Sequence, residues 1–179
     1  PSIKYKYSGG GITISQLIIQ DITGDSYDAF MLKNVLTPIG MTNSFYTQPP
    51  PKEKQSSAAT GYYNDGKEVK GKYYLYSEQA AAGLWTNPTD LAKYIIETQL
   101  SLQGKSNKVL SQEMTKIRLA PYIDTAWALG VFIEKTKGGN YFVHFGHNAG
   151  FVAQYYGSIE DGNGVVVMAN TDNMAILNE

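Results

Sequence analysis

Residues 127–170, WALGVFIEKTKGGNYFVHFGHNAGFVAQYYGSIEDGNGVVVMAN, have the periodicity of strands rather than of helices. Four strands are predicted in this stretch, at residues 127–134, 140–145, 151–159 and 164–170. They are separated only by short turns that contain glycine, such as Lys137-Gly138-Gly139. Because parallel strands need long crossover connections, the sequence predicts an antiparallel meander.

Upstream of this sheet the sequence predicts four helices, at residues 13–24, 25–38, 87–104 and 111–119. Thr13 and Gln16 have the spacing of a capping box, so the three glycines at positions 9–11 are expected to precede the first helix. The third helix has the clearest start, because Asn87 is a capping residue and Pro88 suits the first helical position. Helices followed by an antiparallel sheet predict an α+β fold.

The length of 179 residues is that of one domain. We therefore expect a single domain over residues 1–179, with residues 1–125 mainly helix and loop and residues 126–179 forming the sheet. The chain has 15 Lys and Arg against 16 Asp and Glu, a balance that argues against a nucleic-acid partner. Its apolar runs are too short to span a membrane, and the lack of cysteine excludes disulfides and a thiolate nucleophile.

The two ends of the sequence suggest a piece of a longer protein. The sequence starts at Pro1 without a methionine and stops at Glu179, just after an apolar segment has begun. An expressed fragment, a proteolytic fragment and a natural truncation all fit these ends, and the sequence does not choose among them.

The stretch Tyr7-Ser8-Gly9-Gly10-Gly11 has three interpretations. A glycine-rich loop before a helix can cradle a phosphate, but neither the dinucleotide spacing nor the nucleotide-loop spacing is present. The glycines can also form a plain loop that enters a helix. In the third interpretation Tyr7 is the functional residue, and the small residues after it let a substrate approach closely.

His144 and His147 are the two histidines of the chain. Residues three apart on a strand point to opposite faces, and no third ligand stands nearby, so we expect no metal site and no cofactor. The plain alternatives are a hydrogen-bonded His144 on a half-buried strand and a loop position for His147. Tyr62-Tyr63-Asn64 and Lys137-Gly138-Gly139 have the form of catalytic motifs, but both fall in predicted turns.

Five segments carry a family resemblance. They are YSGGG at 7–11, PIGMT at 38–42, AAAGLWTNPTDLA at 80–92, HFGHNAGF at 144–151 and GVVVMAN at 164–170. In this order they resemble the β-lactamase-related serine hydrolases, which include class C β-lactamases, D-alanyl-D-alanine peptidases and esterases. The similarity extends over essentially the whole chain. It implies a partial β-lactamase or penicillin-binding-protein-like fold.

The resemblance also implies site residues. Relatives use Ser-x-x-Lys with the serine as nucleophile, Tyr-x-Asn or a variant, and Lys-x-Gly or His-x-Gly on an edge strand. Tyr7 matches the second motif and would act as general base and then as acid. His144 and Gly146 match the third motif, so His144 would hold a polar group of the substrate and help to tune the tyrosine. The backbone N–H of His147 would be one of two oxyanion donors.

Two departures from the family pattern bear on activity. Gly9 stands where many relatives have Asn, a variant familiar among esterase- and peptidase-like members, and this weakens a β-lactamase assignment. No Ser or Thr is followed three residues later by Lys, so the nucleophile is absent from this sequence. We therefore expect the chain to be inactive alone and to expose apolar surface, with the N-terminal segment or another chain as its partner.

The leading hypothesis is a part of a serine hydrolase that forms an acyl-enzyme with D-alanyl peptide, β-lactam or ester substrates, in the periplasm or secreted. The substrate would be a small molecule or a peptide, and the motifs do not select one of the three classes. The main alternative is a non-catalytic binding or scaffold protein, such as a sensor of peptidoglycan fragments, that has kept the fold. A third hypothesis is an unrelated module that binds small ligands or sugars through its many tyrosines.

Overall fold

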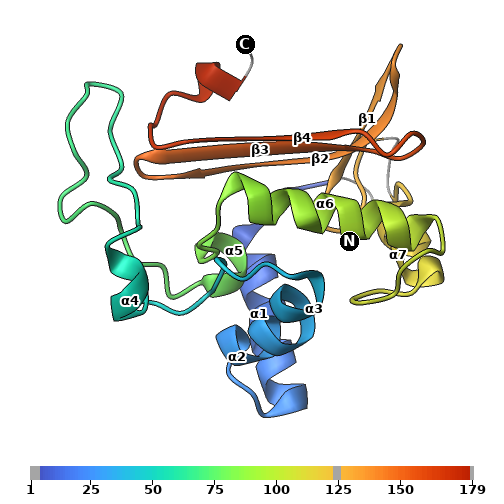
Figure 1. Ribbon diagram of the computed structural model, residues 1–179, viewed down its shortest axis with the longest axis horizontal. Coiled ribbons are helices and arrows are strands. Elements are labelled where there is room, and N and C mark those ends of the chain that lie inside the picture. Colours follow the sequence, from blue (N-terminus) through green and yellow to red (C-terminus); the bar gives the residue numbers. More distant parts are fainter. Residues whose placement is uncertain (1–4, 123–125, 178–179) are drawn as a thin grey trace.

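The computed structural model describes residues 5–122 and 126–177 and has an α+β architecture (Figure 1). Four strands form one sheet in the order β1-β2-β3-β4, and all neighbours are antiparallel. The strands are β1 (Phe132–Thr136), β2 (Gly139–Asn148), β3 (Phe151–Ser158) and β4 (Gly164–Ala169). In Figure 1 the helix α6 (Pro88–Leu102) runs directly beneath the sheet. The predicted fold class and the antiparallel meander are confirmed.

Two strands have bounds that differ clearly from the predicted ones. β1 begins at Phe132 instead of Trp127, because Gly130 has a φ of 73° and turns the chain back. Trp127 then pairs with Phe132 only in an isolated bridge. β2 continues past Phe145 to Asn148, because its last residues still pair with the start of β3 across a tight turn.

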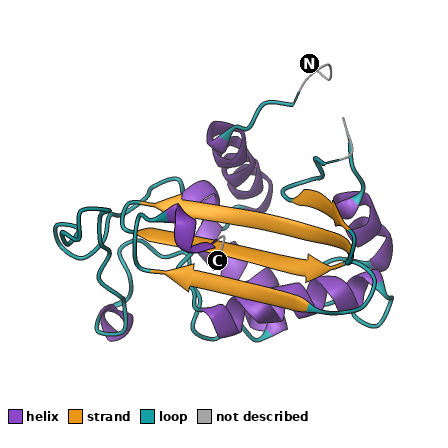
Figure 2. Ribbon diagram, turned by 90° about the horizontal axis from the view of Figure 1, so that it is seen from above, coloured by secondary structure: helices purple, strands orange, loops and turns teal. Residues whose placement is uncertain are grey.

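The core lies between the sheet and two helices, α6 and α7 (Gln112–Leu119). Phe142 of β2 is completely buried and lies opposite Gly157 of β3. A Cβ at position 157 would come within 2.2 Å of the Phe142 ring, so only glycine leaves room for that ring. Ile95 of α6 and Leu119 of α7 belong to the same cluster. Viewed from above, the strands lie in front of most of the helices (Figure 2).

Both helices of this core begin where the sequence predicts. The Asn87 side chain accepts the backbone N–H of Asp90 at 2.9 Å, at the start of α6. The Ser111 hydroxyl accepts the N–H of Met114 at 3.2 Å, at the start of α7. Each cap satisfies an N–H group that the first helical turn leaves without a partner.

The first helix, α1 (Gly9–Thr23), begins earlier than the sequence predicts. Ser8 is its N-cap, and the Ser8 hydroxyl accepts the N–H of Gly11 at 3.0 Å. Thr13 does not cap the helix, because its hydroxyl donates to the Gly9 carbonyl within the helix. The three glycines therefore form the first turn of α1 instead of preceding it. The predicted stop at Gly24 is confirmed.

The second predicted helix is a continuous helical stretch that changes its hydrogen-bond pattern. It consists of α2 (Tyr27–Met31), the π-helical segment η1 (Leu32–Leu36) and α3 (Thr37–Ile39). Its N-cap residue is Ser26 rather than Asp25. The stretch does not end at Thr37-Pro38, because it passes through the π-helical segment and Pro38 lies in the first turn of α3. Gly40, with a φ of 77°, ends it.

Three short helical segments lie outside these long elements. They are α4 (Lys52–Gln55), α5 (Gln79–Ala82) and η2 (Met174–Leu177). The α5 segment packs against α1, and η2 contacts the strands β3 and β4. The segments α5 and η2 thus place the end of one loop and the end of the described chain on the main body.

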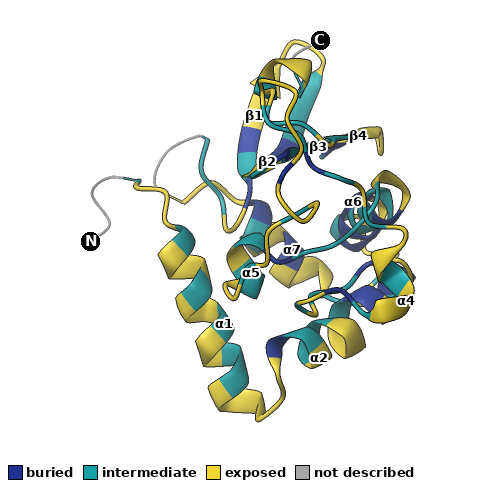
Figure 3. Cartoon of the chain, turned by 90° about the vertical axis from the view of Figure 1, so that its left-hand side faces the viewer, coloured by how far each residue is buried: buried dark blue, intermediate teal, exposed yellow. Residues whose placement is uncertain are grey.

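The helix α1 has exposed surface along its length in Figure 3, and its exposed residues include an apolar stripe of Ile14, Leu17, Ile18 and Ile22. No residue of α1 is buried, and Ile14 and Ile22 are 61% and 79% exposed. Phe145 of β2 and Val165 of β4 are also exposed. The expected apolar surface is therefore present. Among the residues described, no helix combines the length and the apolar character that a membrane crossing requires.

Candidate active site

Tyr7 and His144, from two of the predicted motifs, line one cavity of about 510 Å³. The cavity lies between the loop before α1, the segment η1, the helix α6 and the strands β1 and β2. Aromatic side chains form much of its wall, namely Tyr5, Tyr46, Tyr94, Trp127, Phe132 and Tyr155. The Tyr7 side chain is 62% exposed and is open to a ligand. The fold thus brings together two side chains that lie far apart in the sequence.

A series of aromatic rings connects the Tyr7 loop with His144. The Tyr5 ring stacks on Trp127 with centroids 3.7 Å apart and an angle of 8° between the planes. The rings of Trp127 and Phe132 are nearly perpendicular, with centroids 4.8 Å apart. Phe132 in turn stacks on the His144 imidazole at 5.4 Å. These contacts fix the loop before α1 against the strand that carries His144.

The His144 side chain is in an environment that disfavours its charged form. Burial lowers the pKa of His144 from its ordinary value of 6.5, and the positive charge of Arg118 lowers it further, while a hydrogen bond with the Phe145 backbone partly opposes both. His144 is therefore neutral near pH 7. A neutral imidazole can donate or accept a hydrogen bond but brings no positive charge to the cavity.

Arg118 reaches the wall of the same cavity from α7. Its guanidinium donates a hydrogen bond to the Tyr94 hydroxyl and lies 5.5 Å from the centre of the Tyr94 ring. The hydroxyls of Tyr94 and Tyr155 are 3.4 Å apart. Burial raises the pKa of Tyr155 well above its ordinary value of 10.0, so this hydroxyl keeps its proton. The hydroxyls of Tyr94 and Tyr155 and the Arg118 guanidinium thus form one polar network at the wall of the cavity.

The backbone of His147 lies on an open edge of the sheet. β1 pairs with β2 only as far as the pair Phe132 and Val143. The Ile159 N–H donates to the Asn140 carbonyl, so the backbone groups of Asn140 face β3. Because these groups alternate along a strand, those of His147 point away from β3, toward the edge beyond the end of β1. Within the described part of the chain, no strand pairs with this edge.

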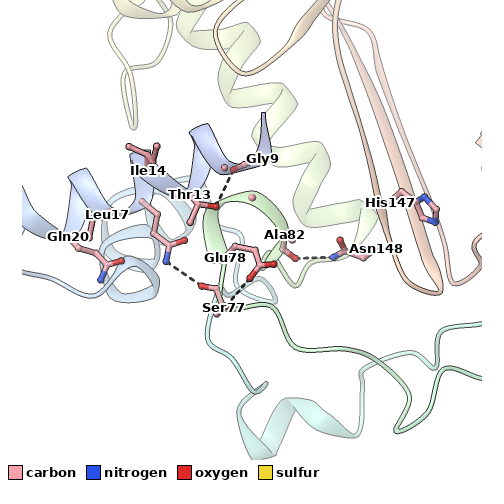
Figure 4. A pocket seen from close by; sticks show the side chains of 13 residues that line it. Gly9, Thr13, Ile14, Leu17, Gln20, Ser77, Glu78, Ala82, His147 and Asn148 are labelled. Atoms are coloured by element: carbon pink, nitrogen blue, oxygen red, sulfur yellow. Dashed lines mark hydrogen bonds between the residues drawn. The ribbon is translucent and has the colours of Figure 1, made fainter. Parts of the chain in front are cut away.

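A second cavity, of about 890 Å³, lies between α1 and α5 and reaches the end of β2 (Figure 4). The Gln16 side chain links the two helices, because its carbonyl oxygen accepts the N–H of Ala80 at 2.9 Å. Asn148 closes the far end by donating to the Ala82 carbonyl at 2.9 Å. His147 lines this cavity, and its ring points away from α1 in Figure 4.

The structure separates the predicted site residues into two groups. Tyr7 and His144 share the first cavity, and His147 lines the second. Gly146 lies between the two histidines on β2, and a Cβ at this position would meet no atom within 4 Å. Among the residues that the structure describes, no three His, Asp or Glu side chains are grouped as a metal site would require.

The two segments that imitate catalytic motifs are turns, as predicted. Tyr63 and Gly66 close a turn in which the Gly66 N–H donates to the Tyr63 carbonyl at 2.9 Å. Lys137 and Gly138 connect β1 to β2. Neither segment lines one of the two cavities.

Three further residues that the motifs do not indicate shape the site, namely Trp127, Arg118 and Asp172. Asp172 lies just after β4, and its Oδ1 is 3.1 Å from Nε2 of His147. A polar residue at the end of a predicted strand is a weak signal for such a contact. The contact of Arg118 with Tyr94 depends on how α7 packs against α6, for which the sequence has no local signal.

The fold has counterparts among solved structures. The octameric penicillin-binding protein homologue from Pyrococcus abyssi has a TM-score of 0.78 and 24% identity, over 95% of this chain and 39% of that chain. The D-amino acid amidase from Ochrobactrum anthropi SV3, complexed with D-phenylalanine, has a TM-score of 0.71 and 20% identity, over 94% of this chain and 55% of that chain. The fold is thus that of the class of α+β proteins to which these two belong.

Sequence comparison then identifies the family. The profile of the family described as Beta-lactamase matches residues 1–176. PbpX of Bacillus subtilis (strain 168), a protein named as a penicillin-binding protein, is 22% identical over 147 residues, which are 80% of this chain and 35% of PbpX. The chain belongs to the beta-lactamase family, as its motifs predict. It spans about a third of the length of PbpX.

Proposed function

We propose that this chain is the C-terminal portion of a serine hydrolase that forms an acyl-enzyme with D-alanyl peptides, β-lactams or esters. The observation that carries the proposal is the shared cavity, because Tyr7 and His144 come from distant segments and match two family motifs in order. Membership in the beta-lactamase family supports acyl transfer as the reaction type. So does the fold shared with a D-amino acid amidase.

In the proposed reaction a serine hydroxyl attacks the carbonyl carbon of the acyl donor while Tyr7 takes the hydroxyl proton. The bond to the leaving nitrogen or oxygen then breaks, and Tyr7 returns the proton to that atom. Water repeats the two steps and releases the acyl group. The exposure of Tyr7 and the stacking of neighbouring Tyr5 on Trp127 suit a base held at the wall of the cavity.

The negative charge that develops on the carbonyl oxygen requires N–H donors. The His147 N–H, which is directed at the open edge of β2, is proposed as one of two. His144 is proposed to hold a polar group of the substrate through a hydrogen bond. Relatives with Lys-x-Gly place a positive charge here, whereas the lowered pKa of His144 leaves a neutral ring.

The serine nucleophile has to be supplied by a partner. No Ser or Thr of this sequence has Lys three residues later, so we propose that an N-terminal segment or another chain carries Ser-x-x-Lys. The exposed stripe of α1, including Ile14 and Ile22, and the exposed Phe145 are proposed to be covered by that partner. The variant Ile22→Lys tests this contact. It should weaken association with the partner and change the free energy of unfolding of the chain by no more than about 0.5 kcal/mol.

Gly9 bears on the choice of acyl donor. It lines the cavity between α1 and α5, and a Cβ at this position would meet no atom within 4 Å. The side-chain amide that many relatives have here is missing, which favours peptidase- or esterase-like substrates over β-lactams. The location proposed with this function is the periplasm or the cell exterior, as the family resemblance implies.

The test compares the chain alone with the chain supplied with a polypeptide that carries Ser-x-x-Lys. The probes are a nitrophenyl ester and a fluorescent penicillin, and mass spectrometry establishes which polypeptides are present. We expect no turnover by the chain alone. With the partner we expect ester hydrolysis and a covalent label that disappears when the serine is replaced by alanine.

Two results would contradict this proposal. Ester turnover by the chain with no second polypeptide present would move the nucleophile into this sequence. Binding of the penicillin without any covalent label, in the complete protein, would favour the non-catalytic alternative, a binding or scaffold protein that has kept the fold.

A further inference from the structure

The turn between β2 and β3 is held by Asp172, a residue just beyond the end of β4. One atom, Oδ1, accepts the N–H of Gly150 at 2.5 Å and lies 3.1 Å from Nε2 of His147. The backbone N–H of Asp172 donates to the Tyr62 carbonyl at 2.9 Å. The Asp172 side chain is only 16% exposed. The carboxylate of Asp172 thus ties the end of β2 to the segment after β4, and the backbone N–H of the same residue ties that segment to the loop at Tyr62.

Other segments hold the same turn without contacting the His147 ring. Asn148 donates to the Ala82 carbonyl at 2.9 Å, and the Ala149 N–H donates to the Tyr76 hydroxyl at 3.3 Å. Gly150 has a φ of 80°, and a Cβ there would come within 2.6 Å of the Val69 side chain. The turn is therefore closely packed, and among these contacts the bond to Asp172 is the one that restrains His147 itself.

His147 needs such a restraint because its strand is paired on one side only. Beyond Val143 the strand β2 pairs with β3 but no longer with β1. The peptide that carries the His147 N–H therefore lacks a ladder on its outer edge. A donor in an oxyanion site has to be held to within about 0.5 Å of its working position.

The contact between Asp172 and His147 defines which ring nitrogen of His147 carries the proton. A carboxylate only accepts hydrogen bonds, so His147 donates through Nε2 and its Nδ1 carries no proton when the ring is neutral. The same carboxylate oxygen accepts the Gly150 N–H. An asparagine at position 172 keeps an oxygen acceptor of similar size, whereas an alanine keeps none.

We propose that Asp172 is a positioning residue for the oxyanion donor. Its Oδ1 accepts a hydrogen bond from the His147 ring and another from the Gly150 N–H. These two bonds keep the His147 peptide directed at the open edge of β2. The catalytic meaning of this inference rests on the proposed function. The positioning itself is a property of this chain and can be measured without a substrate.

The experiment is ¹⁵N relaxation and imidazole ¹⁵N NMR on the 179-residue chain and its variants. Asp172→Ala removes both bonds, and Asp172→Asn keeps an acceptor for Gly150. The matched control is Asp161→Ala in the β3–β4 turn, where Asp161 also accepts a backbone N–H, that of Asn163, at 3.0 Å. The order parameters of the Phe142 and Val143 amides, in the buried part of β2, show whether the rest of the sheet stays rigid.

We expect order parameters of about 0.85 at residues 146–149 in the wild type and in Asp161→Ala. Asp172→Ala should lower them toward about 0.6 and abolish the preference for the Nε2–H form of His147, and Asp172→Asn should restore most of the rigidity. The amides of Phe142 and Val143 should stay rigid in every variant. Unchanged values at residues 146–149 in Asp172→Ala would overturn the proposal.

A kinetic measurement separates this inference from the proposed function. In the protein supplied with its serine, Asp172→Ala should lower kcat about 100-fold and leave KM within about threefold, because only a transition-state contact is misplaced. A comparable kcat in wild type and Asp172→Ala would overturn the positioning role. A complete lack of acyl transfer in the wild type would refute the proposed function, while the relaxation data would still decide the positioning.

A second variant covers the case in which Asp172→Ala fails to fold. His147→Leu removes only the ring bond and leaves the Gly150 N–H with its acceptor. It should lower the order parameters at residues 147 and 148 and leave residue 150 rigid. Rigid amides at all three positions would contradict the proposal.

Discussion

Tyr5 and Trp127 stack face to face, with ring centroids 3.7 Å apart, although one precedes the first helix and the other precedes the sheet. Because Trp127 also contacts Phe132, and Phe132 stacks on His144, the contact links the loop of Tyr7 to the strand of His144. Aromatic packing thus connects the segment that carries Tyr7 with the strand that carries His144.

The coupling between Tyr5 and Trp127 can be measured by a double-mutant cycle. Stacked aromatic pairs contribute about 0.5–1.5 kcal/mol beyond the area they bury, so Tyr5→Ala and Trp127→Ala should be non-additive by about 1 kcal/mol in the free energy of unfolding. Urea denaturation of the two single variants and the double variant gives this value. A control cycle of Trp127→Ala with Tyr74→Ala should be additive. Additivity in the first cycle would mean that the stack does not hold the loop.

The lowered pKa of His144 predicts how stability depends on pH. In the unfolded chain the histidine takes up a proton near its ordinary pKa of 6.5, and in the folded chain only at lower pH. Below about 6.5 the unfolded state therefore binds more protons, and stability should fall as the pH decreases, until the folded pKa is passed. Urea midpoints should show a smaller decrease between about pH 7.5 and pH 5 in His144→Gln than in the wild type. Equal decreases would refute the burial of a neutral His144.

The contact between Phe142 and Gly157 predicts a large effect of a single methyl group. Gly157→Ala should destabilise the chain by about 2 kcal/mol, because the new Cβ overlaps the Phe142 ring and the core has to shift. The matched control is Gly146→Ala on the adjacent strand, where a Cβ meets no atom within 4 Å, and its effect on stability should be small. Similar stabilities for the two variants would contradict the described packing of β2 on β3.

Elements with clear local signals could be predicted from the sequence. The capping residues Asn87 and Ser111 define where α6 and α7 begin, and short glycine turns define the meander. The start of α1 could not be predicted, because three glycines are poor helix formers and the cap at Ser8 overrides that propensity. The passage through Pro38 depends on a π-helical segment that no residue pattern announces.

The residues of the candidate site could be predicted where a motif includes them, and not where only tertiary packing brings them together. Tyr7 and His144 follow from the family resemblance, and the structure places both at one cavity. The residues that hold this site in place could not be predicted in the same way. The contacts of Arg118 with Tyr94 and of Asp172 with His147 join elements that only the tertiary fold brings together. Such contacts leave no spacing rule in the sequence.

The proposed role of Tyr7 as general base can be tested in the protein supplied with the Ser-x-x-Lys polypeptide. The measurement is the rate of covalent labelling by a fluorescent penicillin in the wild type, in Tyr7→Phe and in the exposed-tyrosine control Tyr122→Phe. We predict a loss of about two to four orders of magnitude in Tyr7→Phe and none in the control, as expected when a general base is removed. A labelling rate in Tyr7→Phe close to that of the wild type would show that another residue is the general base.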